Sequence, residues 1–597
     1  MDKINVLYKK NYNFIVNIFF PCILVLYPLV KINQGIDVAD TTYSLANFQY
    51  FGSMDGTWMV ATFLANALGS LLMHLPFGGT LMGMYFYTAL IQSITALGIY
   101  NALRRRLPVR APAPLIFIGE LMALGLCWCP STILYNYLTY LIMDAGVILL
   151  YKGIVENNRR YYVAAGVLLG MNVAVRMPNV VQAAFIVAVW YGSMLSGRKL
   201  TESVKDTLWC MLGYVAGFGA PFLAICVRYG TGAYPAMVQT MFAMTQKATD
   251  YKPSAMVTGM FGDYITGLYW LVFAGICMAG GWALFAVQHR WFAGRPNMTV
   301  LCQSVYVAVL VVLLRFYWGR GVFTFRYYEY SSMYYPAVLL LIAAICSAVY
   351  WLFGKEIGKE HRIMAVLVLT QIFVTPLGSN NGLYPIINNL FFVLPFVFWF
   401  CYGRIVSGRH KISAFIWGAP FTLLVVFVLV QSMGFHMTFS FQDGIDGAER
   451  NTRLSAPGKA AGVYTNEDNA AWLSELAGYV EAEGLSGREV ILYGEVPGLG
   501  YLLDMPSALS TFWADLDSYR MVEYERDLKE MTKSPVVIVS APVAAYLNED
   551  ADGMNWFGVE QEVLNEDEKL QMLHKYMTEH DYRESFGNGR YVVYVTQ

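Results

Sequence analysis

Two carboxylates stand three residues apart in a segment that contains no basic residue. Asp37 and Asp40 lie in the stretch GIDVADTTY, shortly after the apolar run 14–30, and residues 32–79 contain no Lys or Arg. If the stretch is helical, the two side chains share a face. Carboxylates without a neutralising cation suit a general base or a metal ligand. The alternative is a solvated turn or a helix cap, because Asp favours both.

Basic residues next to aromatic residues form a second constellation. Arg176 lies at the end of an apolar run, and the segment LRFYWGRGVFTFRYYEY (314–330) interleaves Arg315, Arg320 and Arg326 with aromatic side chains. Guanidinium groups near the lipid headgroups suit the recognition of a phosphate, and the rings suit a neighbouring sugar or isoprenoid. An aromatic belt with snorkelling arginines is an equally open alternative.

Two polar segments add further candidates for binding a substrate. Lys247 and Lys252 lie in the long connection 228–264, where a substrate-gating loop is one interpretation. Asn380 and Asn381 lie in a Gly- and Asn-rich connection whose amides suit a hydroxyl-rich substrate, although turn residues have the same composition.

Long apolar segments must position these residues. The chain has 597 residues, of which 57% are hydrophobic and 14% charged, with a mean hydropathy of +0.44. Apolar runs of roughly 17–20 residues, long enough to cross about 30 Å of hydrocarbon, recur up to residue 433. About thirteen spans are predicted: 13–31, 80–100, 112–129, 133–151, 161–175, 180–194, 206–226, 265–287, 298–315, 336–353, 363–377, 389–403 and 413–433.

Basic residues collect on every second connection between these spans, which defines the cytoplasmic side. The inner side then receives Arg104–Arg106, and the N-terminus is cytoplasmic. The apolar run Trp58–Leu75 would invert every later loop if it were a span. We therefore predict a helix of the first outer loop (32–79) that lies at the interface or leans on the bundle.

The C-terminal part differs sharply in charge from the rest. Residues 434–597 have 28 Asp+Glu against 12 Lys+Arg, a net charge of −16, whereas residues 1–433 carry +15. We predict a membrane domain (1–433) and an extracytoplasmic soluble α/β domain (434–597). Its expected helices begin near residues 466, 515 and 566, and its expected strands are 489–493, 536–539 and 590–595, the last paired with 582–586.

Two short motifs resemble the GT-C superfamily of membrane glycosyltransferases, such as protein O-mannosyltransferases and aminoarabinose transferases. Asp40-Thr41-Thr42-Tyr43 is similar to the first-loop motif, and the segment GVLLGMNVAVRMPN (166–179) looks like a Gly-rich span ending in Arg/Lys-x-Pro. The resemblance implies that Asp40 is the catalytic residue and that Tyr43 lies at the substrate. Several relatives have an acidic pair where this chain has Ala39-Asp40, so Asp37 is the alternative base.

The resemblance implies an enzyme of the inner (plasma) membrane that builds cell-envelope polysaccharide. It would move a hexose or pentose from a polyprenyl-phosphate donor to a glycan, lipid or protein acceptor at the outer face. Membrane lipid is an expected partner and nucleic acid is not, while Mg²⁺ or Mn²⁺ stays open as a cofactor. The alternatives are a transporter or flippase of lipid-linked glycan, and a non-catalytic subunit of a polysaccharide assembly system.

Overall fold

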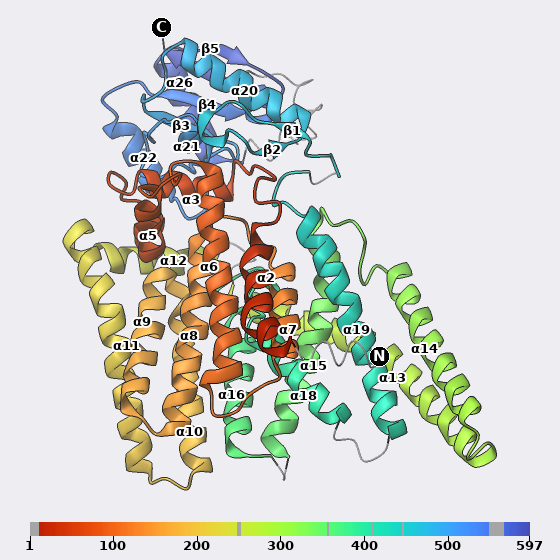
Figure 1. Ribbon diagram of the computed structural model, residues 1–597. Helices are drawn as coiled ribbons and strands as arrows, with labels where there is room; N and C mark the ends of the chain where they lie inside the picture. The colour runs from red at the N-terminus through yellow and green to blue at the C-terminus, as the bar shows by residue number, and fades with distance from the viewer. Residues whose placement is uncertain are drawn as a thin grey trace.

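The computed structural model describes residues 11–247, 252–354, 357–406, 411–444, 447–548 and 566–596. In them the chain forms a helical bundle, and an α/β unit covers one end of that bundle (Figure 1). The last bundle helix ends at Thr438, and all strands follow it. The first outer loop lies at the junction between the two parts (Figure 1).

Nine helical stretches of the described residues are long and apolar enough to cross a membrane, so the chain is a multi-pass membrane protein. They comprise η1–α2 (Ile15–Phe19 and Phe20–Leu26), α6 (Leu81–Asn101), α8 (Leu134–Glu156), η4–α10 (Met177–Phe185 and Ile186–Leu195), α11 (Leu200–Tyr229), α13 (Pro253–Trp291), α14 (Pro296–Gly319), α15 (Tyr334–Phe353) and α19 (Lys411–Thr438).

Four shorter helices occupy the remaining predicted spans. They are α7 (Ala113–Leu126), α9 (Arg159–Val175), α16 (Lys359–Val374) and α18 (Val393–Val406), with 14 to 17 residues each. At 1.5 Å per residue, such helices reach only about 21–26 Å. The fold class, a polytopic helical membrane protein with a C-terminal sheet domain, is confirmed, and the count of about thirteen spans stays a prediction.

The first outer loop contains three short helices. These are α3 (Asp40–Gln49), α4 (Thr57–Ala61) and α5 (Phe63–Met73). With 11 residues, α5 is about 16 Å long, roughly half of the hydrocarbon thickness. It packs against α3, α8 and α9, so the apolar run Trp58–Leu75 leans on the bundle.

The C-terminal unit is built on a four-stranded sheet in the order β3-β4-β6-β5. The strands are β3 (Val490–Tyr493), β4 (Val536–Ser540), β5 (Tyr582–Gly587) and β6 (Tyr591–Thr596). Strands β3 and β4 run parallel with Val490 opposite Val536, and the other pairs are antiparallel. Every residue of β3 and β4 is buried, which is why both read as continuous apolar runs in the sequence.

Helices cover this sheet, and a two-stranded ribbon joins it to the bundle. The helices are α20 (Glu467–Ala482), α21 (Leu499–Leu502), α22 (Met521–Glu530), α23 (Ala541–Leu547) and α26 (Glu568–Glu579), and the ribbon is β1 (Thr452–Arg453) with β2 (Tyr464–Thr465). The Asn466 side chain caps α20 by accepting from the Asn469 N–H at 2.8 Å. The predicted start of this helix is therefore confirmed.

The C-terminal unit lies at one end of the bundle, and a cluster of arginines lies at the other. At one end the Tyr501 hydroxyl of the C-terminal unit donates to the Gly79 carbonyl at 3.0 Å, just before α6 begins. At the other end, α6 continues into the π-helical element η3 (Ala102–Arg106), whose last turn contains Arg104, Arg105 and Arg106. Because α6 is 21 residues long, the two ends are separated by about 31 Å.

We expect Glu495→Cys, but not Arg105→Cys, to react with an impermeant thiol reagent in intact cells. Position 495 is exposed on the C-terminal unit, and the basic connections mark the cytoplasmic side. Each cysteine is introduced into a variant in which the nine native cysteines are replaced. Labelling of position 105 alone would show that the orientation in the membrane is reversed. Labelling of both positions would contradict their placement at opposite ends of the membrane bundle.

Candidate active site

Both carboxylate oxygens of Asp37 accept hydrogen bonds from the backbone of its own turn. One carboxylate oxygen accepts from the Ala39 N–H at 2.8 Å and the other from the Thr41 N–H at 2.7 Å. Only 3% of the residue is exposed. Burial raises the pKa of Asp37, while the two backbone hydrogen bonds act to lower it. With both oxygens engaged, Asp37 holds the start of α3 in place.

Asp40 has the opposite surroundings. It is the first residue of α3, is partly exposed, and its carboxylate receives no hydrogen bond from the described part of the chain. Burial, followed by the like charges of Asp37 and Glu495, raises the pKa of Asp40 to about 7. A carboxylate whose pKa lies near neutral pH is suited to accept a proton. The geometry therefore separates two acids that the sequence leaves equivalent.

The neighbour of Asp40 that sequence reasoning missed is Glu495. It lies in the loop after β3, has a positive φ of 59°, and its N–H donates to Asp515 Oδ2 at 3.0 Å. Burial raises the pKa of Asp515 to about 6, and Glu495 contributes to that rise. The pair of buried strands in the sequence could have pointed to Glu495, because the loops at the carboxyl ends of parallel strands often bind ligands.

Backbone hydrogen bonds connect the turn that contains Asp37 and Asp40 (the acidic turn) to the C-terminal unit. The Gly498 N–H donates to the Val38 carbonyl at 2.7 Å, and the Gly35 N–H donates to the Tyr464 carbonyl at 2.8 Å. The segment Gly498–Gly500 is thus a docking surface for the turn that contains Asp37 and Asp40.

A buried carboxylate reinforces this clamp from the C-terminal unit. Asp443 Oδ2 accepts from the Ile36 N–H and from the Thr465 hydroxyl, both at 2.8 Å. Asp443 is 1% exposed, and burial raises its pKa. The position of the acidic turn therefore depends on residues that follow the whole membrane bundle in the sequence.

Tyr43 is held by the C-terminal unit. Its hydroxyl lies 3.1 Å from Thr511 Oγ1, and its ring packs edge-on against Trp513 with 5.3 Å between centroids. Burial raises the pKa of Tyr43. The phenol is thus neutral, and the ring lines a cavity one helical turn away from Asp40.

The structure joins Arg176 to the Asn-rich connection. The Arg176 guanidinium donates to the Gly378 carbonyl at 3.3 Å and lies 5.7 Å from the centre of the Tyr135 ring. Asn380 and Asn381 follow in the same connection, and both are exposed. These three candidates form a polar surface at the end of the bundle that faces the C-terminal unit. Their binding role stays a prediction.

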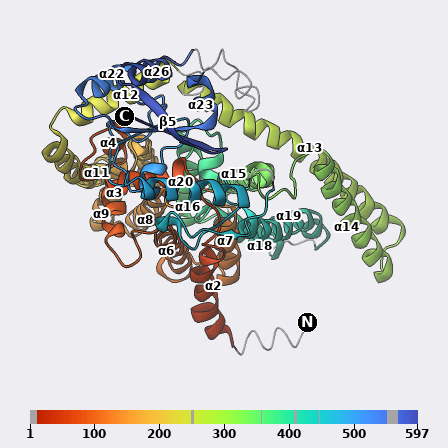
Figure 2. The same cartoon turned by 90° about the horizontal axis from the view of Figure 1, so that it is seen from above.

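The remaining arginines lie on a different part of the molecule. Helices α13 and α14 extend away from the other helices when the molecule is seen from above (Figure 2). Arg315 lies 4.5 Å from the Trp318 ring and Arg320 lies 5.6 Å from the Phe316 ring, whereas Arg326 pairs with Glu329 at 3.6 Å. No recorded contact of the described residues joins these three arginines to the acidic turn.

Lys247 and Lys252 lie in the long connection 228–264. The side chain of Lys247, at the end of α12 (Ala233–Lys247), lies outside the described part of the chain. Lys252 is exposed immediately before α13. Their role as phosphate ligands stays a prediction.

Two cavities flank the acidic turn. One of about 120 Å³ lies toward the membrane, is lined by Asp37 and Thr41, and also contains Lys31 and His436. The other, of about 250 Å³, lies toward the C-terminal unit and is lined by Asp37, Ala39, Asn469, Glu495 and Arg590. Sequence reasoning missed the two cations because Lys31 sits at the end of an apolar run and Arg590 in a hairpin.

Metal ligands are not gathered at this site. Across the described ranges, no three His, Cys, Asp or Glu side chains come together in an arrangement that could hold a metal ion. The oxygens of Asp37 already accept backbone hydrogen bonds. A role for Mg²⁺ or Mn²⁺ stays a prediction.

Comparison with known proteins finds likeness only among solved structures. The sequence matches no known protein-family profile and no curated protein. One similar structure is the oligosaccharyltransferase AglB from Archaeoglobus fulgidus in complex with an inhibitory peptide and a dolichol-phosphate. It is 10% identical, with 90% of this chain and 71% of AglB covered and a TM-score of 0.45.

Another similar structure is ArnT from Cupriavidus metallidurans bound to undecaprenyl phosphate. It is 11% identical, with 96% of both chains covered and a TM-score of 0.39. AglB and ArnT are both GT-C membrane glycosyltransferases. At TM-scores below 0.5 this likeness decides nothing about the chemistry of the present chain, which must follow from its own site.

Proposed function

We propose that this chain is a GT-C-type membrane glycosyltransferase. It would transfer a hexose or pentose from a polyprenyl-phosphate donor to an acceptor hydroxyl at the outer membrane face. The observation that carries the proposal is the contrast between the two acids. Both carboxylate oxygens of Asp37 accept hydrogen bonds from the Ala39 and Thr41 N–H groups, whereas Asp40 is partly exposed and its carboxylate receives none from the described residues. Burial raises the pKa of Asp40 to about 7.

In the proposed reaction, the acceptor oxygen forms a bond to the anomeric carbon of the donor sugar. The bond between that carbon and the phosphate oxygen breaks, and polyprenyl phosphate leaves with the bonding electrons. Asp40 takes the proton of the acceptor hydroxyl. A positioned base of this kind typically contributes 10²- to 10⁴-fold to the rate.

The membrane-side cavity suits the donor. It lies at the outer end of the helices, so a lipid chain stays in the bilayer while the phosphate reaches the acidic turn. Lys31 lines this cavity and supplies a cation there, and an ammonium is a common phosphate ligand. The cavity on the opposite side of the turn faces the C-terminal unit and suits the acceptor.

The proposal predicts a specific pH dependence for transfer from a synthetic polyprenyl-phosphate sugar. Because the base must be ionised, the rate should rise about tenfold per pH unit below the pKa of about 7 and level off above it. Glu495→Gln removes a like charge and should shift this inflection to lower pH. Steady-state kinetics from pH 5 to 9 provide the measurement.

An inflection near pH 4 in both proteins would remove Asp40 from the role of base. Movement of the intact donor across the bilayer, without cleavage of the sugar–phosphate bond, would support a flippase instead. Bond cleavage is followed by the release of free polyprenyl phosphate, so the two outcomes are distinguished in one assay.

A further inference from the structure

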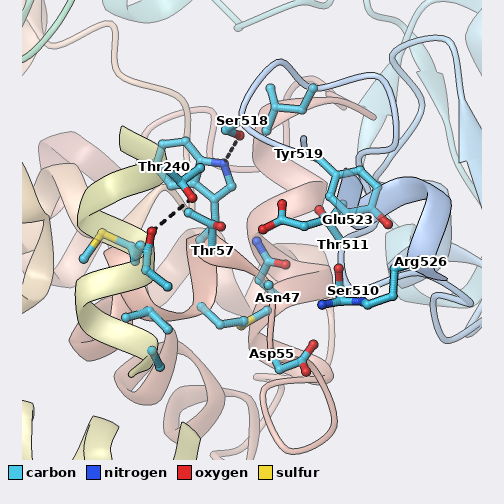
Figure 3. Close-up of a pocket in the computed structure, with 18 of the residues that line it drawn as sticks. Asn47, Asp55, Thr57, Thr240, Ser510, Thr511, Ser518, Tyr519, Glu523 and Arg526 are labelled. Carbon is cyan, nitrogen blue, oxygen red and sulfur yellow. Dashed lines mark hydrogen bonds between the residues drawn. The ribbon is translucent and has the colours of Figure 1, made fainter. Parts of the chain in front are cut away.

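A third cavity lies where three distant segments meet. Its volume is about 150 Å³, and it is enclosed by the first outer loop, by α12 and by the C-terminal unit (Figure 3). Ligand sites for drug-sized molecules are usually 300–1,000 Å³. This cavity therefore fits one small group, such as a single sugar ring.

Asn47 is a buried polar residue in the lining of this cavity. Its side chain lies among the lining residues (Figure 3), and only 5% of the residue is exposed. Within the described part of the chain, no group donates a hydrogen bond to its Oδ1. A buried acceptor without a donor loses its hydrogen bonds to water and gains none in return, which costs folding free energy. A ligand hydroxyl that donates to Asn47 Oδ1 would remove this cost.

The remaining lining favours a carbohydrate over an acyl chain. The indole N–H of Trp58 donates to Ser518 Oγ at 2.7 Å, and the Tyr43 hydroxyl is held by Thr511. These contacts fix aromatic rings beside hydroxyl and amide groups. An aromatic ring packs against the C–H face of a sugar, while the polar groups bind its hydroxyls.

The cavity is aligned with the proposed base. Asp40, Tyr43 and Asn47 are spaced i, i+3 and i+7 on α3, so they lie along one face of that helix. At 1.5 Å per residue, Asn47 is about 10 Å from Asp40 along the axis. A group held at Asn47 is therefore a neighbour of the reacting unit and not the reacting unit itself.

We propose that this cavity is an acceptor subsite that binds the sugar next to the reacting one, so that the acceptor is an oligosaccharide. This inference rests on the proposed function and narrows its acceptor class. A lipid acceptor would need an apolar channel at this position, and a lone monosaccharide would leave the subsite empty.

Binding is tested first, without donor, on the full-length protein in nanodiscs. Maltose, lactose and α-1,6-mannobiose at millimolar concentration are probed by saturation-transfer NMR, with their monosaccharides in parallel. At least one disaccharide should bind through both rings to the wild type. Asn47→Leu should reduce the signal of one ring at least fivefold, because it removes the buried acceptor.

A conservative variant and a matched control accompany this test. Thr57 also lines the cavity (Figure 3). Thr57→Val keeps the shape of the lining, is expected to weaken the same ring signal, and covers the case in which Asn47→Leu does not fold. Asn101→Leu makes the same exchange at the far end of α6, where the amide donates to the Leu97 carbonyl at 2.9 Å, and should change nothing.

Kinetics then separate this inference from the proposed function. With a polyprenyl-phosphate sugar as donor, the kcat/KM for octyl disaccharide acceptors should be at least tenfold higher than for octyl monosaccharide acceptors. The Asn47 or Thr57 variant should lose this difference. Absence of disaccharide binding in the wild type, or binding unchanged in both variants, would overturn the subsite. A wild type that binds disaccharides but never cleaves the donor would overturn the transferase and not the subsite.

Discussion

Asp40→Asn is expected to slow sugar transfer by 10²- to 10⁴-fold while leaving donor binding close to that of the wild type. The amide has nearly the same shape as the carboxylate but cannot accept the proton of the acceptor hydroxyl at neutral pH. Transfer from a synthetic polyprenyl-phosphate sugar, measured alongside donor affinity and thermal unfolding, checks this result.

The same variant should not lose stability at pH 8. The pKa of Asp40 rises from 3.8 to about 7 in the folded protein. A carboxyl whose pKa is raised by folding stabilises the fold most at low pH, and that contribution is lost as the pH rises through about 7. The ionised Asp40 is therefore unfavourable at pH 8, and Asn removes this penalty. The melting temperature should equal or exceed that of the wild type.

Asp37→Asn provides the matched comparison because the same exchange is made three residues away. Its carboxylate accepts from both the Ala39 and Thr41 N–H groups, and the amide can accept through only one oxygen. Loss of such a cap costs about 0.5–2 kcal/mol, so this variant should melt at a lower temperature. If Asp37→Asn abolishes transfer at unchanged stability while Asp40→Asn remains active, the base is Asp37.

Local elements of the fold are predictable because their signals are local. Residues 489–493 and 536–539 read as buried strands, and β3 and β4 occupy these positions. The expected helix near 515–532 is shorter in the structure, where α22 spans Met521–Glu530. Asp515, which lies six residues before the start of α22, instead accepts a hydrogen bond from the Glu495 N–H. A tertiary contact thus replaces the helical start that the charge pattern suggests.

The sequence locates the acidic turn, but residue types and spacing alone do not rank its two acids, and only the resemblance favours Asp40. Their ranking depends on which N–H groups the turn directs at Asp37, and on the approach of Glu495 from a domain that follows the whole bundle. Neither contact leaves a periodic pattern. The segment 314–330 shows that suitable residue types do not by themselves identify a binding site. Arg315 and Arg320 have the chemistry to bind a phosphate, but their guanidinium groups stack on nearby aromatic rings of the same segment.

Gly498→Ala is expected to reduce transfer about 10²-fold by displacing the acidic turn. A Cβ atom at this position would lie 1.6 Å from Thr42 Oγ1 and 2.6 Å from the Val38 carbonyl oxygen. Its φ of −74° suits any residue, so the conflict is with the docked turn and not with the backbone of the loop itself. Overpacking of this kind typically costs about 1–3 kcal/mol.

The loss of rate follows from the position of Thr42, two residues after Asp40 in α3. A displacement of about 1 Å at a reacting group can cost about 10²-fold, and Gly498 also provides the N–H that holds Val38. Gly478→Ala in α20 is the control, because no atom lies within 4 Å of the added methyl group. It should leave transfer unchanged and stabilise the helix slightly.

Two measurements decide whether docking of the C-terminal unit positions the base. Glu495→Cys should become more reactive toward an impermeant thiol reagent when Gly498→Ala is added, because the loop separates from the turn. The same reactivity should stay unchanged when Gly478→Ala is added. Full transfer activity in Gly498→Ala would show that the acidic turn keeps its geometry without the C-terminal unit. Asp40 would then act independently of Glu495, and the pH inflection should no longer respond to Glu495→Gln.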